Sequence, residues 1–433
     1  MIIKRSLFSS LAVCGLLAAS AVSAQSPALA GNKYPGKVHL LPATLETTQW
    51  GWFDNAQAPV LTVDSGDTVV METMMHAHNQ VVPGKTIEDL KKLRTDNPGR
   101  GPHTVTGPIF VNGAEPGDVL KIKIQRIVPR AYGTNFNIPG MFGQFPKDFA
   151  DGQVKYLYLD MERMTTEFLP GIQIPLKPFP GTIGVARAEP GRYSTVPPGE
   201  YAGNMDIREL SEGTTLYVPV WVKGALLWSG DSHAAQGNGE VNLTAIETAF
   251  KELAVTLDVV KGMKLDFPLI ETANAWVTMG FDKDLNLALD QAKAQTVKFL
   301  AEQRKLGAEE AAKLMPRVSD CRVSQVVNIK KGVHCMSPKN VKAKVVMPVR
   351  PAAETKDYLV TVGKDADMNK AMDSASMAMI GLLQEKKELK RLDAYGLASV
   401  AMDCRVGDVS GAEKNVHCVL PKSLWQAPKA KKI

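Results

Sequence analysis

The sequence predicts an α+β protein in which a mainly-β sandwich body precedes a duplicated strand–helix–hairpin region. Up to about residue 265 the chain is rich in Gly and Pro and contains many short alternating apolar runs, a pattern typical of β-sandwiches and barrels. Beyond residue 265 the chain repeats itself at a constant offset, and each copy contains apolar residues at helical spacing.

The β-rich body is predicted to extend over residues 25–265. Turn signals of the X-Gly-X kind separate its apolar runs, at residues 64–67, 115–118 and 211–214. The runs themselves alternate in the way that half-buried strands do. The clearest of them cover residues 60–63, 68–73, 119–124, 155–159 and 215–222.

The C-terminal region is an internal duplication with an offset of 83 residues. Between residues 271 and 341, 27 of the 71 aligned positions are identical in the second copy. Chance would give roughly 4 or 5 identities, so the repeat is real. We place the first copy at residues 266–345 and the second at 346–425, each with a strand, a helix, a second short helix and a closing hairpin. A short basic tail, residues 426–433, follows.

The first 24 residues have the features of a secretory signal peptide. Lys4 and Arg5 precede an apolar run from Leu7 to Ala21, and small residues suited to cleavage precede Gln25. Later segments lack the roughly 18 uninterrupted apolar residues of a membrane span. The sequence therefore predicts a periplasmic or secreted protein with no membrane contact after cleavage. The net charge of +6 forms no basic stripe interleaved with aromatics, which argues against nucleic-acid binding.

Four cysteines remain after leader removal, and they occupy equivalent positions in the two copies. A hairpin centred near residue 328 would place Cys321 opposite Cys335, and one centred near residue 411 would place Cys404 opposite Cys418. We predict these two disulfides, with four buried free thiols as the alternative. Paired cysteines cannot act as nucleophiles, because a disulfide sulfur offers no thiolate.

Histidine is scarce, with seven in the chain. His334 and His417 are repeat partners beside the cysteines and are assigned to the hairpins, and His39 to the first strand. His76 and His78 follow a predicted strand; if it continues, both imidazoles project from one face, as metal ligands do. The alternative is a polar loop with two exposed imidazoles. His103 and His233 complete the candidates.

Two polar, glycine-rich segments carry the remaining candidates. Residues 230–240 crowd Asp231, His233, Gln236, Asn238 and Glu240 among three glycines, a density that is costly unless a ligand or metal satisfies it. Residues 197–206 add the second set, Gly203, Asn204 and Asp206. An elaborate polar turn is the alternative.

The residue types predict a divalent metal centre with Asp206, Asp231, His233, His76, His78 and His103 as candidate ligands. Zinc fits this mixture best, and calcium or another divalent ion is the alternative. Such a metal activates water for attack on an amide carbonyl, and Glu240 is suited to carry the proton to the leaving nitrogen. We assign Asp231, His233, Glu240 and Asn204 to catalysis, and Gln236, Asn238 and Gly203 to substrate binding.

At these residues the sequence resembles the acetamidase/formamidase family. The matching segments are residues 107–118, 203–206, 213–220 and 230–240, and the match continues through 276–282 and 325–328 to 338–339. The resemblance implies hydrolysis of short linear amides such as formamide or acetamide to acid and ammonia. It also implies a β-sandwich body, homo-oligomers and a bound divalent metal.

The chain departs from the family pattern at its leader, at Asn238, where an acid is usual, and at Met75-His76, where an acidic residue is usual near position 75. The second repeat copy is an addition to the shorter family pattern, expected to cap or mimic a subunit contact. Two hypotheses follow. The first is a metal-assisted amidase; the alternative is a non-catalytic exported protein that binds a ligand or metal on the same fold.

Overall fold

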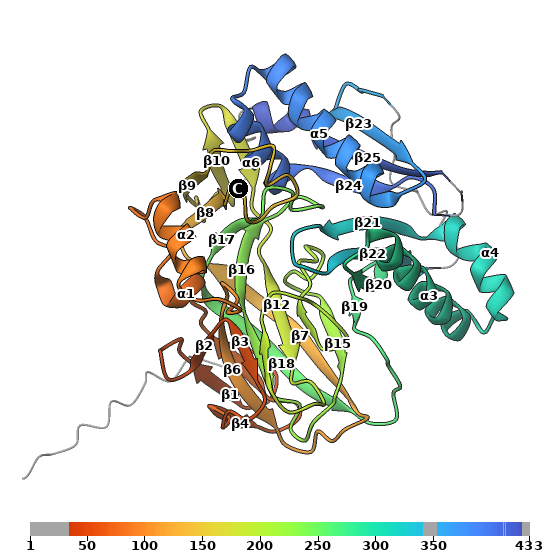
Figure 1. Cartoon of the computed structure of the whole chain (residues 1–433). Coiled ribbons are helices and arrows are strands. Elements are labelled where there is room, and N and C mark those ends of the chain that lie inside the picture. Colours follow the sequence, from red (N-terminus) through yellow and green to blue (C-terminus); the bar gives the residue numbers. More distant parts are fainter. Residues whose placement is uncertain (1–33, 341–352, 410, 412, 427–433) are drawn as a thin grey trace, which may run out of the picture. The chain divides into compact units, whose positions relative to one another are not determined.

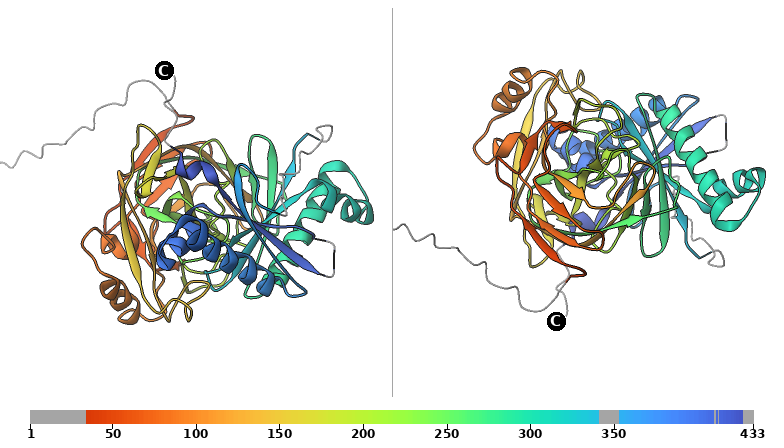
Figure 2. Two further views of the ribbon diagram at one scale, coloured as in Figure 1. Left: turned by 90° about the horizontal axis from the view of Figure 1, so that it is seen from above. Right: turned by 90° about the horizontal axis from the view of Figure 1, so that it is seen from below.

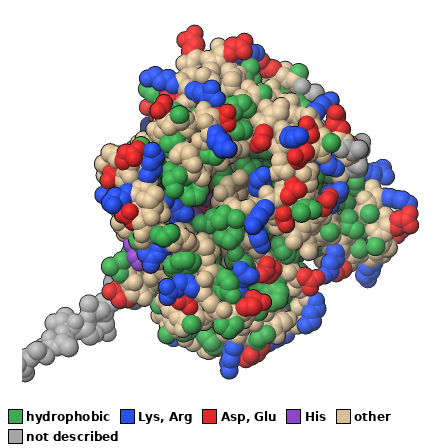
Figure 3. Space-filling model, in the orientation of Figure 1, with side chains coloured by type: hydrophobic (Ala, Val, Ile, Leu, Met, Phe, Trp, Pro, Cys, Tyr) green, Lys and Arg blue, Asp and Glu red, His purple; other side chains and the backbone are tan. Residues whose placement is uncertain are grey.

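Two large β-sheets dominate the structure, a computed structural model that describes residues 34–340, 353–409, 411 and 413–426. The predicted leader, and all but the first residue of the predicted tail, lie outside these residues. The described part is mostly β, with six α-helices (Figure 1). None of the helices described here combines the length and hydropathy needed to span a bilayer. Acidic and basic side chains are interspersed over the face shown in Figure 3.

The first sheet has twelve strands and runs from the body into both repeat copies without a break. Its strands pair in the order β1 (Val38–Leu41), β5 (Thr68–Met71), β18 (Phe250–Val260), β7 (Val119–Pro129), β15 (Thr215–Pro219), β19 (Leu269–Glu271), β20 (Ala275–Asp282), β22 (Lys331–Pro338), β21 (Asp320–Gln325), β24 (Asp403–Val406), β25 (Lys414–Pro421) and β23 (Tyr358–Asp365).

The second sheet has nine strands and carries most of the candidate site residues. Its main path is β14 (Ala202–Asn204), β12 (Phe179–Val185), β16 (Leu227–Ala235), β17 (Ile246–Thr248), β8 (Tyr132–Asn137) and β9 (Gln153–Tyr158). From β16 it branches to β6 (Thr104–Val111), which also pairs with β2 (Thr48–Trp50) and β4 (Leu61–Val63). Two small ribbons pair β10 (Thr165–Leu169) with β11 (Ile172–Pro175), and β13 (Arg192–Ser194) with β3 (Trp52–Asp54).

Side chains of both sheets meet in one buried apolar cluster. Val69 and Ile122 of the first sheet share it with Ile183 and Trp228 of the second, and all four are fully buried. Removing this apolar surface from water is the main force that holds the two sheets together. The cluster therefore fixes the strands β12 and β16 in place beneath the site.

The two repeat copies have the same order of elements. The first contains β20, α3 (Leu285–Arg304), α4 (Ala308–Val318), β21 and β22; the second contains β23, α5 (Met368–Lys387), α6 (Arg391–Ala401), β24 and β25. The long helix of each copy packs on that copy's strands (Figures 1 and 2). A short 3-10 helix, η1 (Lys422–Trp425), ends the described chain.

Both cysteine pairs lie directly opposite each other on their hairpins and are joined in disulfides. Cys321 faces Cys335 with a Cα–Cα distance of 4.0 Å, and Cys404 faces Cys418 at 4.1 Å. The within-copy pairing is the arrangement that the spacing of the cysteines predicted.

The two copies contact each other through equivalent residues. Asp284 caps α3 and Asp367 caps α5, each accepting a hydrogen bond from the backbone N–H two residues on. Each capping carboxylate also accepts a hydrogen bond from the other copy. Asn286 Nδ2 donates to Asp367 Oδ1 at 2.8 Å, and Asn369 Nδ2 donates to Asp284 Oδ1 at 2.7 Å. Reciprocal contacts of this kind are what a two-fold interface between subunits has.

The loop between β16 and β17, residues 236–245, is held by both copies; we call it the Glu240 loop. From the second copy, Ser399 O accepts from Gly237 N (2.9 Å), and Tyr395 Oη donates to Val241 O (2.7 Å). From the first copy, Ser324 O accepts from Gly239 N (3.0 Å). The repeats therefore position a segment of the candidate site.

Candidate active site

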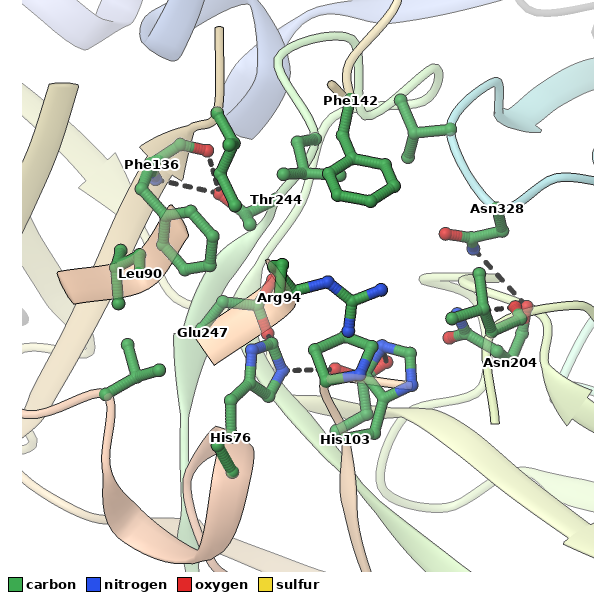
Figure 4. Close-up of a pocket in the computed structure, with 18 of the residues that line it drawn as sticks. His76, Leu90, Arg94, His103, Phe136, Phe142, Asn204, Thr244, Glu247 and Asn328 are labelled. Carbon is green, nitrogen blue, oxygen red and sulfur yellow. Dashed lines mark hydrogen bonds and ion pairs between the residues drawn. The ribbon is translucent and has the colours of Figure 1, made fainter. Parts of the chain in front are cut away.

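The candidate site is a cavity on the second sheet, lined by residues of the strands β8, β14, β16 and β17, of helix α2 (Ile87–Thr95) and of the short helix α1 (His76–Asn79). Its floor is polar and its walls are apolar (Figure 4). The apolar walls include Leu90, Phe136 and Phe142. The floor carries His76, His103, Asn204, Asp206, Asp231, His233, Glu240 and Glu247.

Asp231 lies at the centre of the floor, on β16. Its Oδ1 is 2.9 Å from His76 Nε2 and 3.4 Å from His233 Nε2. Its Oδ2 lies 3.1 Å from Thr182 Oγ1 and 3.6 Å from His103 Nε2. The preceding residue must be glycine, because a Cβ there would lie 2.1 Å from the carbonyl oxygen of residue 104 on the neighbouring strand.

The three carboxylates Asp206, Asp231 and Glu240 share an uncommon backbone conformation. Their φ angles are +50°, +49° and +48°, in the left-handed region that non-glycine residues rarely adopt. Strained backbone of this kind persists only where its surroundings enforce it, and it clusters at functional sites.

Glu247 on β17 is a central member of the floor that sequence reasoning missed. Its Oε2 lies 3.1 Å from His233 Nε2 and 3.4 Å from His76 Nε2, while Oε1 accepts from the backbone N–H of Ala245 (2.9 Å). It sits in the plain strand sequence Ile-Glu-Thr, outside both polar segments. Nothing in the local pattern separated it from an ordinary strand carboxylate.

Two imidazoles have their Nδ1 atoms occupied, which leaves Nε2 facing the floor. His233 Nδ1 lies 2.9 Å from Gln236 Oε1, and His103 Nδ1 lies 3.0 Å from Thr195 Oγ1. An outer partner on one ring nitrogen fixes the orientation of the ring and is the usual arrangement for metal-binding histidines.

Burial and neighbouring charges shift the pKa values of the carboxyl groups in the floor in opposite directions. Burial raises the pKa of Asp206 to about 7, with the charge of His233 opposing it and that of Asp231 adding to it. Burial and Asp206 raise the pKa of Glu240 well above its usual range. Burial alone would raise the pKa of Asp231, but the neighbouring imidazoles, His103 and His233 among them, hold it well below its usual range. The floor thus combines a carboxyl of lowered pKa, Asp231, with one of raised pKa, Glu240.

The pKa values of the imidazoles His76 and His103 also shift in opposite directions. Burial would lower the pKa of His76, but its bonds to Asp231 and Glu247 raise it to about 9. Burial lowers the pKa of His103 to about 4. His76 is therefore the more basic of these two imidazoles, and His103 is the more easily kept neutral.

Several sequence-based assignments are wrong in detail. His78 does not share a face with His76, because the strand ends at Met71 and the chain turns through left-handed residues, with φ of 52° at Ala77 and 51° at His78. His78 instead lies 3.2 Å from Thr48 Oγ1, with its ring against Trp50. The alternative of two exposed imidazoles is also wrong, since His76 is buried.

The three residues assigned to substrate binding do not line the cavity. Gln236 orients His233 through its contact with Nδ1, the ring nitrogen that does not face the floor, and its Nε2 donates to Asp206 O (3.0 Å). Asn238 donates from Nδ2 to Asp403 Oδ1 (2.6 Å) in the second repeat copy. Gly203 pairs with Ile183 in the sheet, and a Cβ there would face Tyr201 rather than the cavity.

Asn204 and Asn328 lie on the same side of the cavity (Figure 4). Asn204 does line the cavity, but its amide is engaged, accepting from Thr182 Oγ1 (2.9 Å) and donating to Val196 O (3.0 Å). Asn328, from the β21–β22 turn, donates to Asp206. From the sequence, this turn served to centre the hairpin and as part of the family resemblance, and Asn328 was given no role in the site.

Three groups of side chains in the described structure have the spacing of metal ligands. They are His76 with His103 and Asp231, Asp231 with His233 and Glu247, and Asp206 with His233 and Glu240; the ligand atoms within each group lie within 4.8 Å of one another. In addition, His76 Nδ1 and Glu240 Oε2 are buried with no hydrogen-bond partner among the described residues. Mixed imidazole and carboxylate ligands suit zinc.

A buried cluster of imidazoles and carboxylates under a small cavity is the kind of centre that hydrolytic enzymes use. The chain matches the profile of the acetamidase/formamidase family over residues 46–192 and 185–426. It therefore belongs to the acetamidase/formamidase family.

Relatives with the family's activities in their names align with part of the chain. An acetamidase of Mycolicibacterium smegmatis is 27% identical over 219 residues, which cover 37% of this chain and 54% of that protein. A formamidase of Methylophilus methylotrophus is 26% identical over 243 residues, covering 43% and 58%. The chain thus spans little more than half the length of these relatives.

Solved acetamidase structures share the fold. The acetamidase of Bacillus halodurans superposes with a TM-score of 0.64 at 29% identity, covering 71% of this chain and 100% of that one. The acetamidase of Yersinia enterocolitica gives 0.64 at 27% identity, covering 72% and 94%. The mostly-β architecture of this chain is therefore that of acetamidases.

Proposed function

We propose that the protein hydrolyses short linear amides of the formamide and acetamide kind to a carboxylic acid and ammonia, assisted by a divalent metal ion. The observation that carries the proposal is the buried floor, where Asp231 and Glu247 meet three imidazoles beside the carboxyl of Glu240. Family membership and the names of the relatives support the same reaction class.

The residues of the floor fit a metal ion. His76, His103 and Asp231 form one group of two imidazoles and a carboxylate. Asp231 also belongs to a second group, with His233 and Glu247. When bound there, a divalent cation supplies Lewis-acid polarisation of the carbonyl and a more acidic water. We propose zinc as that ion because of the two imidazoles.

Glu240 and Glu247 take opposite parts in the proposed reaction. The raised pKa of Glu240 favours its protonated form, so Glu240 is the acid that protonates the leaving nitrogen. Although burial opposes it, the charge of His233 lowers the pKa of Glu247, so Glu247 is ionised and accepts a proton from the attacking water. Two carboxyl groups whose pKa values are pushed apart are the usual mark of such an acid–base pair.

The non-catalytic alternative loses one of the observations that motivated it. Asn238, which replaces an acid of the family pattern, points away from the cavity and bonds to Asp403. The substitution therefore leaves the charged floor of the cavity unchanged.

The test is ammonia release from formamide and acetamide by the purified full chain, together with elemental analysis of its metal content. Glu240→Gln should lower kcat by roughly 100-fold or more, since a positioned acid contributes about that much. Glu162→Gln, which changes an exposed carboxylate in the same way, should retain wild-type rates. Wild-type protein with bound metal and no turnover of any short amide would refute the proposal.

We also propose that the protein is exported and that it assembles into homo-oligomers. The leader and the two disulfides support export, since disulfides persist in oxidising compartments. The proposal of homo-oligomers rests on the family resemblance. Cell fractionation and sedimentation velocity are the respective tests.

A further inference from the structure

Arg94 brings a positive charge into the apolar wall of the cavity. It lies on α2, one turn after Leu90, and its guanidinium is directed into the cavity on the side of His103 (Figure 4). The guanidinium carbon lies 5.1 Å from the centroid of the Phe142 ring, which also lines the cavity. The side chain is half-buried.

The guanidinium has hydrogen-bonding capacity to spare. Of its five N–H donors, one bond is made, from Nη1 to Arg100 O at 2.8 Å. No carboxylate within the described ranges lies at ion-pair distance from Arg94. Its neighbours on the same helix differ, because Lys91 pairs with Glu88 (2.9 Å) and Lys92 with Asp96 (2.7 Å).

The position of Arg94 is costly without an anion. Burial lowers its pKa, and no acidic group opposes that effect. A cation in an apolar wall is stabilised when a paired charge and hydrogen bonds satisfy it. Neutral formamide or acetamide supplies neither.

We propose that Arg94 binds a carboxylate carried by the substrate, so that the preferred substrates are short amides with a carboxylate at the far end of the acyl chain. This inference rests on the proposed amide hydrolysis. The amide end occupies the floor, the methylene groups contact Leu90 and Phe136, and the carboxylate takes the free N–H groups of Arg94. A planar guanidinium is suited to such a pair because it donates two parallel bonds to one carboxylate.

The size of the cavity fits such a molecule. It offers about 80 Å³ for the centres of water-sized groups. At roughly 10–15 Å³ for each water-sized position, that is room for roughly five to eight non-hydrogen atoms. Succinamate, a four-carbon amide with a terminal carboxylate, falls at the top of this range, and butyramide is its neutral counterpart of equal chain length.

The experiment compares succinamate with butyramide in steady-state ammonia release by the full chain. Wild type should favour succinamate in kcat/KM, mainly through KM. Arg94→Gln should remove roughly 10- to 100-fold of kcat/KM for succinamate, the usual contribution of a charged hydrogen-bonded pair, and should lower kcat/KM for butyramide far less. Lys92→Gln removes the same charge from an exposed position of the same helix and should change neither value. Arg94→Lys should recover part of the preference.

Two outcomes overturn the inference while leaving amide hydrolysis intact. One is equal or better use of butyramide by wild type; the other is an equal loss for both substrates in Arg94→Gln, which would assign Arg94 a structural role. Calorimetric titration with succinamate separates the two proposals if no amide turns over. Binding to wild type that is lost in Arg94→Gln would then uphold the anion site and refute the hydrolysis.

Discussion

Gly181 on β12 offers a direct test of whether the geometry of the floor matters. The residue lies beneath two of the proposed functional side chains. A Cβ at this position would lie 2.6 Å from Asp206 Oδ1, 2.6 Å from His233 Cε1 and 2.9 Å from the carbonyl oxygen of Asp231. Gly181→Ala adds that single atom and removes no functional group.

The size of the effect follows from these distances. Non-bonded heavy atoms settle at about 3.5–4.0 Å, so Asp206 and His233 must move by roughly 1 Å or the strand must shift. Overpacking of a tight site costs about 1–3 kcal/mol of stability. A displacement of about 1 Å of positioned groups can cost about 100-fold in rate. We expect a folded protein with kcat reduced by about that factor.

The assay is steady-state ammonia release together with urea unfolding. Gly381→Ala is the matched control, because this exposed position on α5 has nothing within 4 Å of the added Cβ. The control should retain activity and gain roughly 0.5–1 kcal/mol, since alanine favours a helix interior over glycine. Full activity in Gly181→Ala would show that the positions of Asp206 and His233 do not limit the reaction.

Four further outcomes are expected. Glu247→Gln should lower kcat/KM at least about 100-fold, because its carboxylate faces both His76 and His233; near-normal rates would remove Glu247 from the reaction. His76→Ala should lose bound metal by elemental analysis, whereas His78→Ala, outside the floor, should keep both metal and activity. Burial alone would raise the pKa of Asp403, but Arg208 and Arg405 lower it, so the ionised carboxylate stabilises the fold above the unfolded pKa of about 4 and this stabilisation is lost as pH falls below that value. The melting temperature should therefore fall less steeply between about pH 6 and pH 3 for Asp403→Asn than for wild type. Parallel curves would contradict this. Replacing Cys404 and Cys418 together by Ser should cost roughly 3 kcal/mol in urea unfolding, the value for a loop of about 15 residues; an unchanged midpoint would show that the bridge does not stabilise the fold.

The sequence predicted best what depends on local periodicity. The helices of both copies and the opposed cysteines follow from apolar spacing and from a fixed separation along a hairpin, and no distant contact is needed to find them. Asp231, His233, Asp206 and Glu240 were found because they are concentrated beside glycines in two short segments.

The missed features depend on contacts between distant parts of the chain. Glu247 reaches the floor only because β17 pairs with β16, and Arg94 reaches the cavity only because α2 lines it. His78 was misplaced because the strand already ends at Met71 and because three consecutive left-handed residues follow from Ala77, a conformation that alternation along a strand does not anticipate. Asn238 was misassigned because its partner, Asp403, lies 165 residues away.

The reciprocal caps of α3 and α5 have a consequence for how the protein responds to dilution. Contacts between separate subunits weaken as protein concentration falls, because association is governed by mass action. Here the equivalent contacts join two segments of one polypeptide, so the association is intramolecular and its effective concentration is set by the chain itself. The hydrogen bonds that Ser399 and Tyr395 make to the Glu240 loop are therefore kept at any dilution.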